Sequence, residues 1–186
     1  MPLALKKNSR YTYTDYLSWP DEERWEIIDG QAYNMSPAPK PRHQRVVWNI
    51  SGVLDRNKDK LKGCFPFFSP TDIVFDKHNV LQPDVFVVCD KGKIAENNIE
   101  GAPDLIFEVI SPSTELKDKK EKKALYERFG VKEYLLVHPE AEYVEKYILE
   151  NGKYGLPELL NWNETLKLHT FEIEINLSDI FEKTRE

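Results

Sequence analysis

Long apolar runs are absent from this sequence of 186 residues. No stretch approaches the roughly 20 apolar residues that a helix needs to cross a bilayer. The first residues, Met1 to Lys7, contain no apolar segment of the kind that a signal peptide requires. These absences argue against membrane and secreted proteins, and we expect a cytoplasmic protein with no membrane partner.

Cysteine and basic charge are also scarce. The two cysteines, Cys64 and Cys89, occur without a secretion signal, which favours reduced, partly buried thiols over a disulfide or a metal site. The net charge is −6, from 26 Lys and Arg against 32 Asp and Glu. Because indiscriminate binding to nucleic acid depends on many contacts from basic side chains to phosphates, this class is disfavoured. Lysine clusters such as 117–123 suit either a local basic patch or an ordinary solvated helix face.

Motifs for nucleotide chemistry are missing as well. The sequence has no phosphate-binding glycine-rich loop, dinucleotide fingerprint or nucleophile elbow, so we expect no nucleotide cofactor. It also lacks internal repeats and low-complexity segments. With 40% hydrophobic and 12% aromatic residues, its composition is that of an ordered globular protein. The length suits a single domain, residues 1–186.

Apolar periodicity predicts an α/β fold. Helical spacing runs from residue 43 to about 61 and from 118 to 129, where Gly130 ends the helix. A short helix capped by Thr14 is expected near the N-terminus. Asp29-Gly30 between two β-rich runs predicts a hairpin after that helix.

The remaining β-rich runs predict a mixed sheet covered by helices. Strands are expected at 65–68, 72–75, 85–88, 105–110, 133–137, 143–149, 166–171 and 173–175. The run at 105–110 is apolar on both faces apart from one glutamate, which is typical of a central strand. With the helix that follows and the next strand, it forms a predicted βαβ crossover.

Three charged residues stand where apolar residues are expected. Asp84 follows a proline at the start of a strand, and Glu108 lies within the central strand. Since each helical residue turns about 100°, Lys122 lies on the same apolar stripe as Tyr126. Burying a charge without a partner costs roughly several kcal/mol, so charged residues at such positions indicate a functional site.

These residue types suit phosphodiester hydrolysis. Two carboxylates on adjacent strands can hold Mg²⁺ while leaving positions for water and a phosphate oxygen. A lysine can orient or deprotonate the attacking water and offset the charge that develops on the phosphate. The alternative for Lys122 taken alone is a side chain that packs on Tyr126 and extends to water.

The same residues resemble the PD-(D/E)XK nuclease pattern, with the lysine migrated from the strand to the following helix. From about residue 13 to 181, the sequence resembles the Uma family of restriction-endonuclease-like proteins. Its most specific segment is Glu108-Val109-Ile110-Ser111-Pro112-Ser113-Thr114. The other matching positions are Trp25-Glu26-Ile27-Ile28-Asp29-Gly30, Ser36-Pro37, His43, Gln82-Pro83-Asp84, Asp118, Lys122, Tyr126, Gly130-Val131 and Glu133-Tyr134.

The resemblance implies a restriction-endonuclease-like fold: a central mixed sheet flanked by helices, with an added N-terminal helix and hairpin. It also implies Mg²⁺, with Mn²⁺ as a substitute, DNA as the substrate, and a homodimer. By position, Asp84 and Glu108 are the metal ligands, Lys122 is the catalytic lysine, and Glu26 completes the site through a metal-bound water. Ile110 stands where the standard motif has its lysine, so the role of Lys122 depends on the migrated-lysine interpretation.

His43, Asp118 and Tyr126 are candidates to line the cleft. A lone histidine on an apolar helix face is commonly a core residue, and Asp118, one turn before Lys122, suits an ion pair in the site or an ordinary surface pair. The predicted function is that of a Mg²⁺-dependent endonuclease. Two alternatives remain open: a catalytically degenerate module that binds nucleic acid or protein, and a nuclease specialised for RNA or branched DNA.

Overall fold

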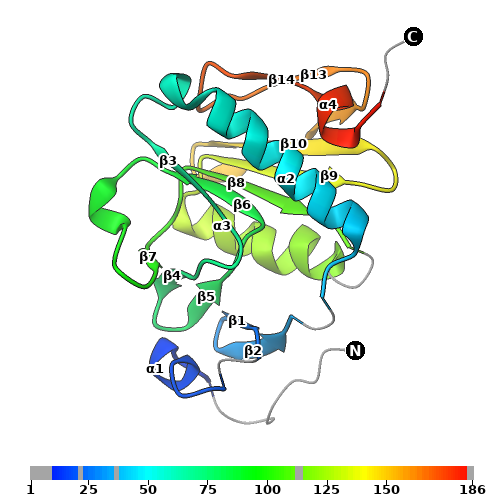
Figure 1. Ribbon diagram of the computed structural model, residues 1–186. Coiled ribbons are helices and arrows are strands. Elements are labelled where there is room, and N and C mark those ends of the chain that lie inside the picture. Colours follow the sequence, from blue (N-terminus) through cyan, green and yellow to red (C-terminus); the bar gives the residue numbers. More distant parts are fainter. Residues whose placement is uncertain (1–9, 21–22, 36–37, 112–114, 184–186) are drawn as a thin grey trace.

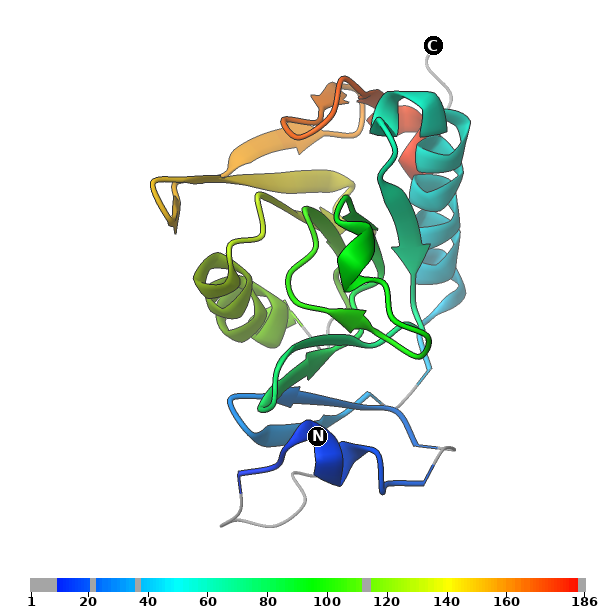
Figure 2. The same ribbon diagram turned by 90° about the vertical axis from the view of Figure 1, so that its left-hand side faces the viewer.

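A large mixed sheet forms the centre of the protein. The computed structural model describes residues 10–20, 23–35, 38–111 and 115–183. The sheet has seven strands in the order β11-β10-β9-β8-β6-β3, with β12 paired to β10. Helix α2 (Pro41–Arg56) covers one face, and the π-helix η3 (Lys117–Lys122) with α3 (Lys123–Phe129) covers the other (Figures 1 and 2). This is the predicted mixed sheet flanked by helices.

The strand at the centre of this sheet is β8, which is buried along its whole length. It pairs parallel with β9 and antiparallel with β6. Because parallel neighbours require a crossover, η3 and α3 complete the predicted βαβ unit. The strands are β3 (Phe65–Phe68), β6 (Val85–Val88), β8 (Leu105–Val109), β9 (Glu133–His138), β10 (Tyr143–Glu150), β11 (Lys153–Tyr154) and β12 (Glu158–Asn161).

A second, smaller sheet lies beside the first, in the order β2-β1-β5-β4-β7. The predicted hairpin is present, and Asp29 and Gly30 in its turn have φ values of 50° and 80°. Its first strand also pairs with β5, so the hairpin belongs to a sheet that the sequence analysis did not separate from the main one. The strands are β1 (Trp25–Ile28), β2 (Gln31–Asn34), β4 (Ile73–Asp76), β5 (Asn79–Leu81) and β7 (Ile99–Glu100).

The N-cap of the N-terminal helix α1 (Tyr13–Tyr16) lies two residues earlier than predicted. Thr12, not Thr14, is the N-cap: its side chain accepts a hydrogen bond from the amide of Asp15, whose carboxylate accepts one from the amide of Thr12. This reciprocal pair is a capping box, which satisfies two amides that a helix end otherwise leaves unpaired. Among the described residues, no helix is both long and apolar enough to cross a membrane.

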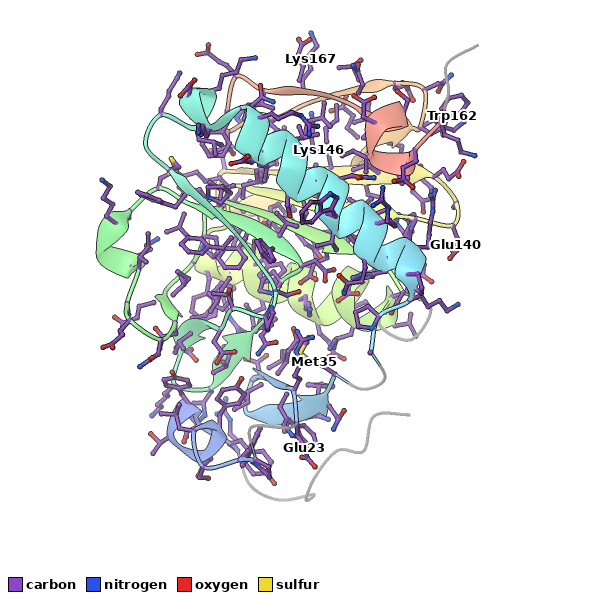
Figure 3. The ribbon with its side chains drawn as sticks, viewed as in Figure 1. Glu23, Met35, Glu140, Lys146, Trp162 and Lys167 are labelled. Carbon is purple, nitrogen blue, oxygen red and sulfur yellow. A yellow bond between two sulfur atoms is a disulfide. The ribbon has the colours of Figure 1, made fainter. Side chains whose placement is uncertain are left out.

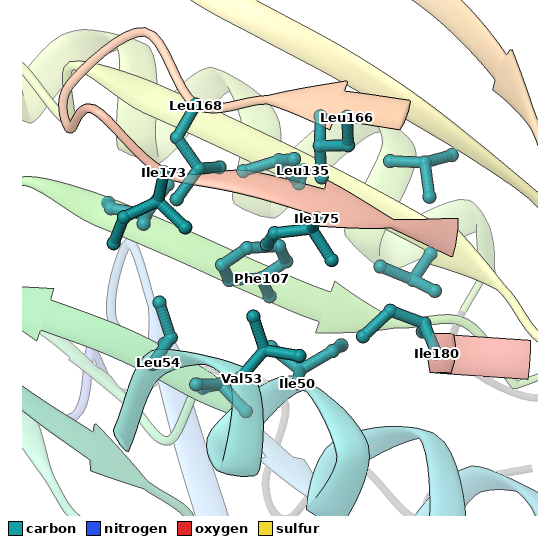
Figure 4. Close-up of a cluster of buried hydrophobic side chains, with 14 of the residues drawn as sticks. Ile50, Val53, Leu54, Phe107, Leu135, Leu166, Leu168, Ile173, Ile175 and Ile180 are labelled. Atoms are coloured by element: carbon teal, nitrogen blue, oxygen red, sulfur yellow. The ribbon is translucent and has the colours of Figure 1, made fainter. Parts of the chain in front are cut away.

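The C-terminal segment covers the α2 side of the main sheet. It comprises β13 (Thr165–Lys167), β14 (Glu174–Asn176) and α4 (Leu177–Phe181); the short helices η1 (Lys58–Leu61) and η2 (Lys91–Lys93) lie earlier in the chain. Figure 4 shows Ile50 of α2, Phe107 of β8 and Ile175 of β14 in one buried cluster. In Figure 3, Glu23 and Met35 lie at the opposite end of the molecule from Lys167. A second cluster, which includes Ile106 and Tyr126, lies on the α3 side of the sheet.

Cys64 and Cys89 form a disulfide, so the prediction of two reduced thiols is wrong. The cause is strand register. Strands β3 and β6 pair antiparallel with Phe65 opposite Val88. Extending this register by one residue places Cys64 opposite Cys89, with 4.0 Å between their Cα atoms. An argument from cellular compartment takes no account of which residues the fold places opposite one another.

Reduction of this disulfide is expected to destabilise the fold. The bond joins residues 25 apart, and in the chain-entropy account closing a loop of this size stabilises a protein by about 3 kcal/mol. We expect dithiothreitol to lower the Tm of the wild type and to leave that of Cys64→Ser, already lowered, unchanged. Differential scanning fluorimetry with and without the reductant measures this. An unchanged wild-type Tm would contradict a stabilising disulfide in solution.

Candidate functional site

Asp84 and Glu108 meet at one end of the main sheet. Strands β6 and β8 pair Val85 with Phe107, and extending this register by one residue places Asp84 opposite Glu108. The amide of Val109 donates to Oδ2 of Asp84 at 2.8 Å, which fixes this carboxylate against β8. Register therefore brings together the two acids that the sequence singled out.

Lys122 lies in a cage of three carboxylates. Its Nζ is 2.8 Å from Oε1 of Glu26, 2.9 Å from Oε1 of Glu108 and 3.5 Å from Oδ1 of Asp118. Only 4% of the side chain is exposed, so Lys122 does not extend to water. An ammonium has three N–H donors, and three carboxylates are enough to engage all of them.

The carboxylate of Glu26 enters this site from the smaller sheet. Glu26 lies on β1 and is fully buried. Its Oε1 accepts a hydrogen bond from the amide of Gln82 at 3.3 Å, in addition to the contact with Lys122. The site is thus assembled from residues of both sheets and of η3.

The three predicted cleft residues all contact the site. Nε2 of His43 lies 3.3 Å from Oδ2 of Asp84, and the hydroxyl of Tyr126 donates to Oε1 of Glu108 at 2.7 Å. Tyr126 is fully buried, so it holds Glu108 in place through this hydrogen bond and does not line an open cleft. Asp118 forms a buried pair with Lys122 instead of a surface pair.

A second lysine, Lys117, was missed as a site residue in the sequence analysis. Its Nζ lies 2.6 Å from Oε2 of Glu26. On an α-helix, residues five apart are turned about 140° from each other, but η3 is a π-helix, whose hydrogen bonds join residues five apart. Lys117 and Lys122 therefore both reach Glu26. Because every residue from 117 to 122 is charged, no apolar periodicity marks the π-helix in the sequence.

The pKa values of the two glutamates, Glu26 and Glu108, are shifted in opposite directions. Burial raises the pKa of Glu26, but Lys122 and Lys117 outweigh it and lower that pKa to about 2. Burial raises the pKa of Glu108 to about 8; Lys122 opposes this shift and the neighbouring carboxylates reinforce it. Because neighbouring carboxylates contribute to the rise in the pKa of Glu108, an added cation would lower that pKa.

Lys122 stays a cation in this environment. Burial lowers its pKa, but Glu108, Glu26 and Asp118 outweigh burial and raise that pKa well above its ordinary value. A protonated ammonium can orient groups and offset negative charge, whereas it cannot accept a proton from water. The geometry therefore favours the orienting role over the deprotonating role considered for this lysine.

The donor set fits a hard divalent cation. Among the described residues, Oδ1 of Asp84 and Oε2 of Glu108 take part in no hydrogen bond or ion pair, so each acid has an oxygen available to a metal. Those residues contain no cluster of three or more His, Cys, Asp or Glu arranged to hold an ion. Mg²⁺ commonly uses one or two carboxylates and completes its shell with water and substrate phosphate, so Asp84 and Glu108 are the residues that could hold it.

Comparison with known proteins identifies the family. The model of the Uma2 family, described as "Putative restriction endonuclease", matches residues 13–178. The chain belongs to this family. The "Uncharacterized protein slr1290" of Synechocystis sp. is 31% identical over 137 residues, which cover 72% of this chain and 71% of that protein. The family resemblance predicted from the sequence is confirmed.

A solved structure has a similar fold. It is the crystal structure of "a putative nuclease belonging to DUF820" from Anabaena variabilis, with a TM-score of 0.76 and 18% identity over 92% of this chain and 97% of that one. At this identity the match establishes the fold, which is restriction-endonuclease-like. Uma2 membership supports a nuclease-type function on nucleic acid. Residues 36–37 and 112–114 of the matching motifs lie outside the described residues.

Proposed function

We propose that this Uma2 protein is a Mg²⁺-dependent endonuclease that hydrolyses phosphodiester bonds in DNA, with Mn²⁺ as a substitute metal. The observation that carries the proposal is the pairing of Asp84 and Glu108 across β6 and β8, each with one carboxylate oxygen engaged by the protein and one available. The buried ammonium of Lys122 beside Glu108 supplies positive charge for a phosphate that gains negative charge in the transition state.

The chain's own residues hold the two proposed ligands in place. The amide of Val109 and the ring of His43 engage one oxygen of Asp84. The hydroxyl of Tyr126 and the ammonium of Lys122 engage one oxygen of Glu108. A divalent cation, when bound, would polarise the phosphate and lower the pKa of a water molecule. In this proposal, Glu26 orients the two lysines.

Metal binding gives the most direct test. We expect calorimetry to show saturable binding of Mn²⁺ and Mg²⁺ to the wild type, strengthened by a short DNA duplex, and no binding to Asp84→Ala/Glu108→Ala. Glu100→Ala is a matched control, because Glu100 is an exposed glutamate at the end of β7 in the smaller sheet. Loss of binding in this control as well would show that the measured binding is not specific to the site.

A second candidate function is a nucleic-acid-binding or protein-binding module without catalysis. The net charge of −6 and the presence of Ile110 where the standard motif has lysine favour it. Absence of metal binding up to millimolar concentrations, even with DNA present, would support this module.

The homodimer is also part of our proposal, and light scattering coupled to size-exclusion chromatography measures it.

A further inference from the structure

Two lysines reach Glu26 from η3, and their surroundings differ. Lys122 has 4% of its side chain exposed and faces three carboxylates. Lys117 has 15% of its side chain exposed, and within the described ranges Glu26 is its one carboxylate partner. Because an ammonium has three donors, Lys117 retains donors for another anion, whereas the buried ammonium of Lys122 is already surrounded by three carboxylates.

Glu26 fixes the position of both ammonium groups. One of its oxygens contacts Lys122 and the amide of Gln82, and the other contacts Lys117. Gln82 lies two residues before Asp84, so Glu26 ties both lysines to the segment that carries a proposed metal ligand. A fully buried carboxylate partner holds an ammonium far more firmly than a surface ion pair does.

Tyr33 provides the second contact of Lys117. Nζ of Lys117 lies 5.5 Å from the centre of the Tyr33 ring, which belongs to β2. The attraction between an ammonium and an aromatic face, although modest, acts within about 6 Å. Tyr33 and Glu26 together hold this ammonium in a partly exposed position.

We propose that Lys117 binds a non-bridging oxygen of the phosphodiester, and that Lys122 is a positioning residue that keeps Glu26 and Glu108 in place. The inference rests on the proposed function and changes the role that the resemblance implies for Lys122. Lysine binds phosphate as a compact point charge. Turning Lys122 toward a substrate would leave buried acids without their counter-charge, which is strongly unfavourable. If the ammonium of Lys117 turns toward the substrate, it exchanges the carboxylate of Glu26 for the phosphate, and Glu26 keeps Lys122 as its counter-charge.

Four variants test this division of roles: Lys117→Met, Lys117→Arg, Lys122→Met and the control Lys120→Met. Lys120 is exposed on the same π-helix. Fluorescence anisotropy with a short labelled DNA duplex in EDTA gives Kd at several salt concentrations, and cleavage in Mg²⁺ gives KM and kcat. We expect Lys117→Met to raise Kd and KM by about tenfold, the size of a lost charge-assisted hydrogen bond. It should also reduce the salt slope by about one.

The other variants separate binding from structure. We expect Lys117→Met to lower the Tm less than Lys122→Met does, because Glu26 keeps Lys122 as a counter-charge, and Lys117→Arg to recover most of the affinity. Equal Kd and KM for Lys117→Met and Lys120→Met would overturn the inference and leave the proposed function intact. A large fall in Tm for Lys117→Met with unchanged KM would overturn it too, because Lys117 would then be structural. If the wild type neither binds nor cleaves the duplex, the proposed function fails and the inference fails with it.

Discussion

Glutamine in place of Glu26 is expected to destabilise the protein by about 3–5 kcal/mol, the cost of removing one partner from a buried ion pair. Glu26 is fully buried and contacts two ammonium groups, those of Lys117 and Lys122. Glutamine has nearly the same shape, so the loss arises from charge and not from a cavity. Urea unfolding of the wild type and the variant at neutral pH measures the difference.

The pH dependence of this difference has a defined direction. The two lysines lower the pKa of Glu26 from its ordinary value of 4.5 to about 2, despite burial. Because the folded-state pKa is the lower one, the stabilisation is fully present above about pH 4.5 and is lost as the pH falls toward 2. The wild type and Glu26→Gln should therefore converge over that range. Glu100→Gln, at an exposed position, serves as the control, and equal stability of all three proteins at pH 7 would contradict the prediction.

Asp84→Asn is expected to reduce DNA cleavage by at least about 100-fold, the loss that follows removal of one preorganised electrostatic group, with little effect on stability. Asparagine retains an oxygen that accepts the hydrogen bond from the amide of Val109. The side chain of Asp84 is 16% exposed, and the ring of His43 lies 3.3 Å from it. The free energy of unfolding should therefore change by less than about 1 kcal/mol. Single-turnover cleavage in Mg²⁺ and urea unfolding measure the two effects.

Asp55→Asn is the matched control for this prediction. Asp55 is exposed on α2, and the same substitution there should change neither cleavage nor stability. Normal cleavage by Asp84→Asn would remove Asp84 from the list of metal ligands. A loss of stability as large as that of Glu26→Gln would show instead that its carboxylate is structural.

The sequence predicts the elements whose signals are local. Asp29-Gly30 specifies a tight turn, and the apolar run around Glu108 specifies a buried central strand, and both are present. The short strands β5 and β7 were missed, since two or three residues give too little periodicity for a pattern. The four-residue strand β12 was missed as well. The separation into two sheets and the pairing of Cys64 with Cys89 depend on register between distant segments, which no local pattern encodes.

The candidate site was predicted where charge interrupts an apolar pattern. Asp84, Glu108 and Lys122 meet that condition, and they lie together at one end of the sheet. Glu26 was found through the family resemblance, because its strand pairs in the other sheet and its partners are far away in the sequence. Lys117 was missed because on an α-helix its side chain would point away from that of Lys122. In the π-helix both side chains reach Glu26.

The contact between Glu26 and Lys117 joins residues 91 positions apart. During synthesis, the hairpin that carries Glu26 is made long before the segment that carries its lysines. Such distant contacts close only after a large loss of chain entropy, so they form late in folding. The candidate site is therefore complete only when both sheets have docked, and the hairpin is as necessary to it as the strands of the main sheet.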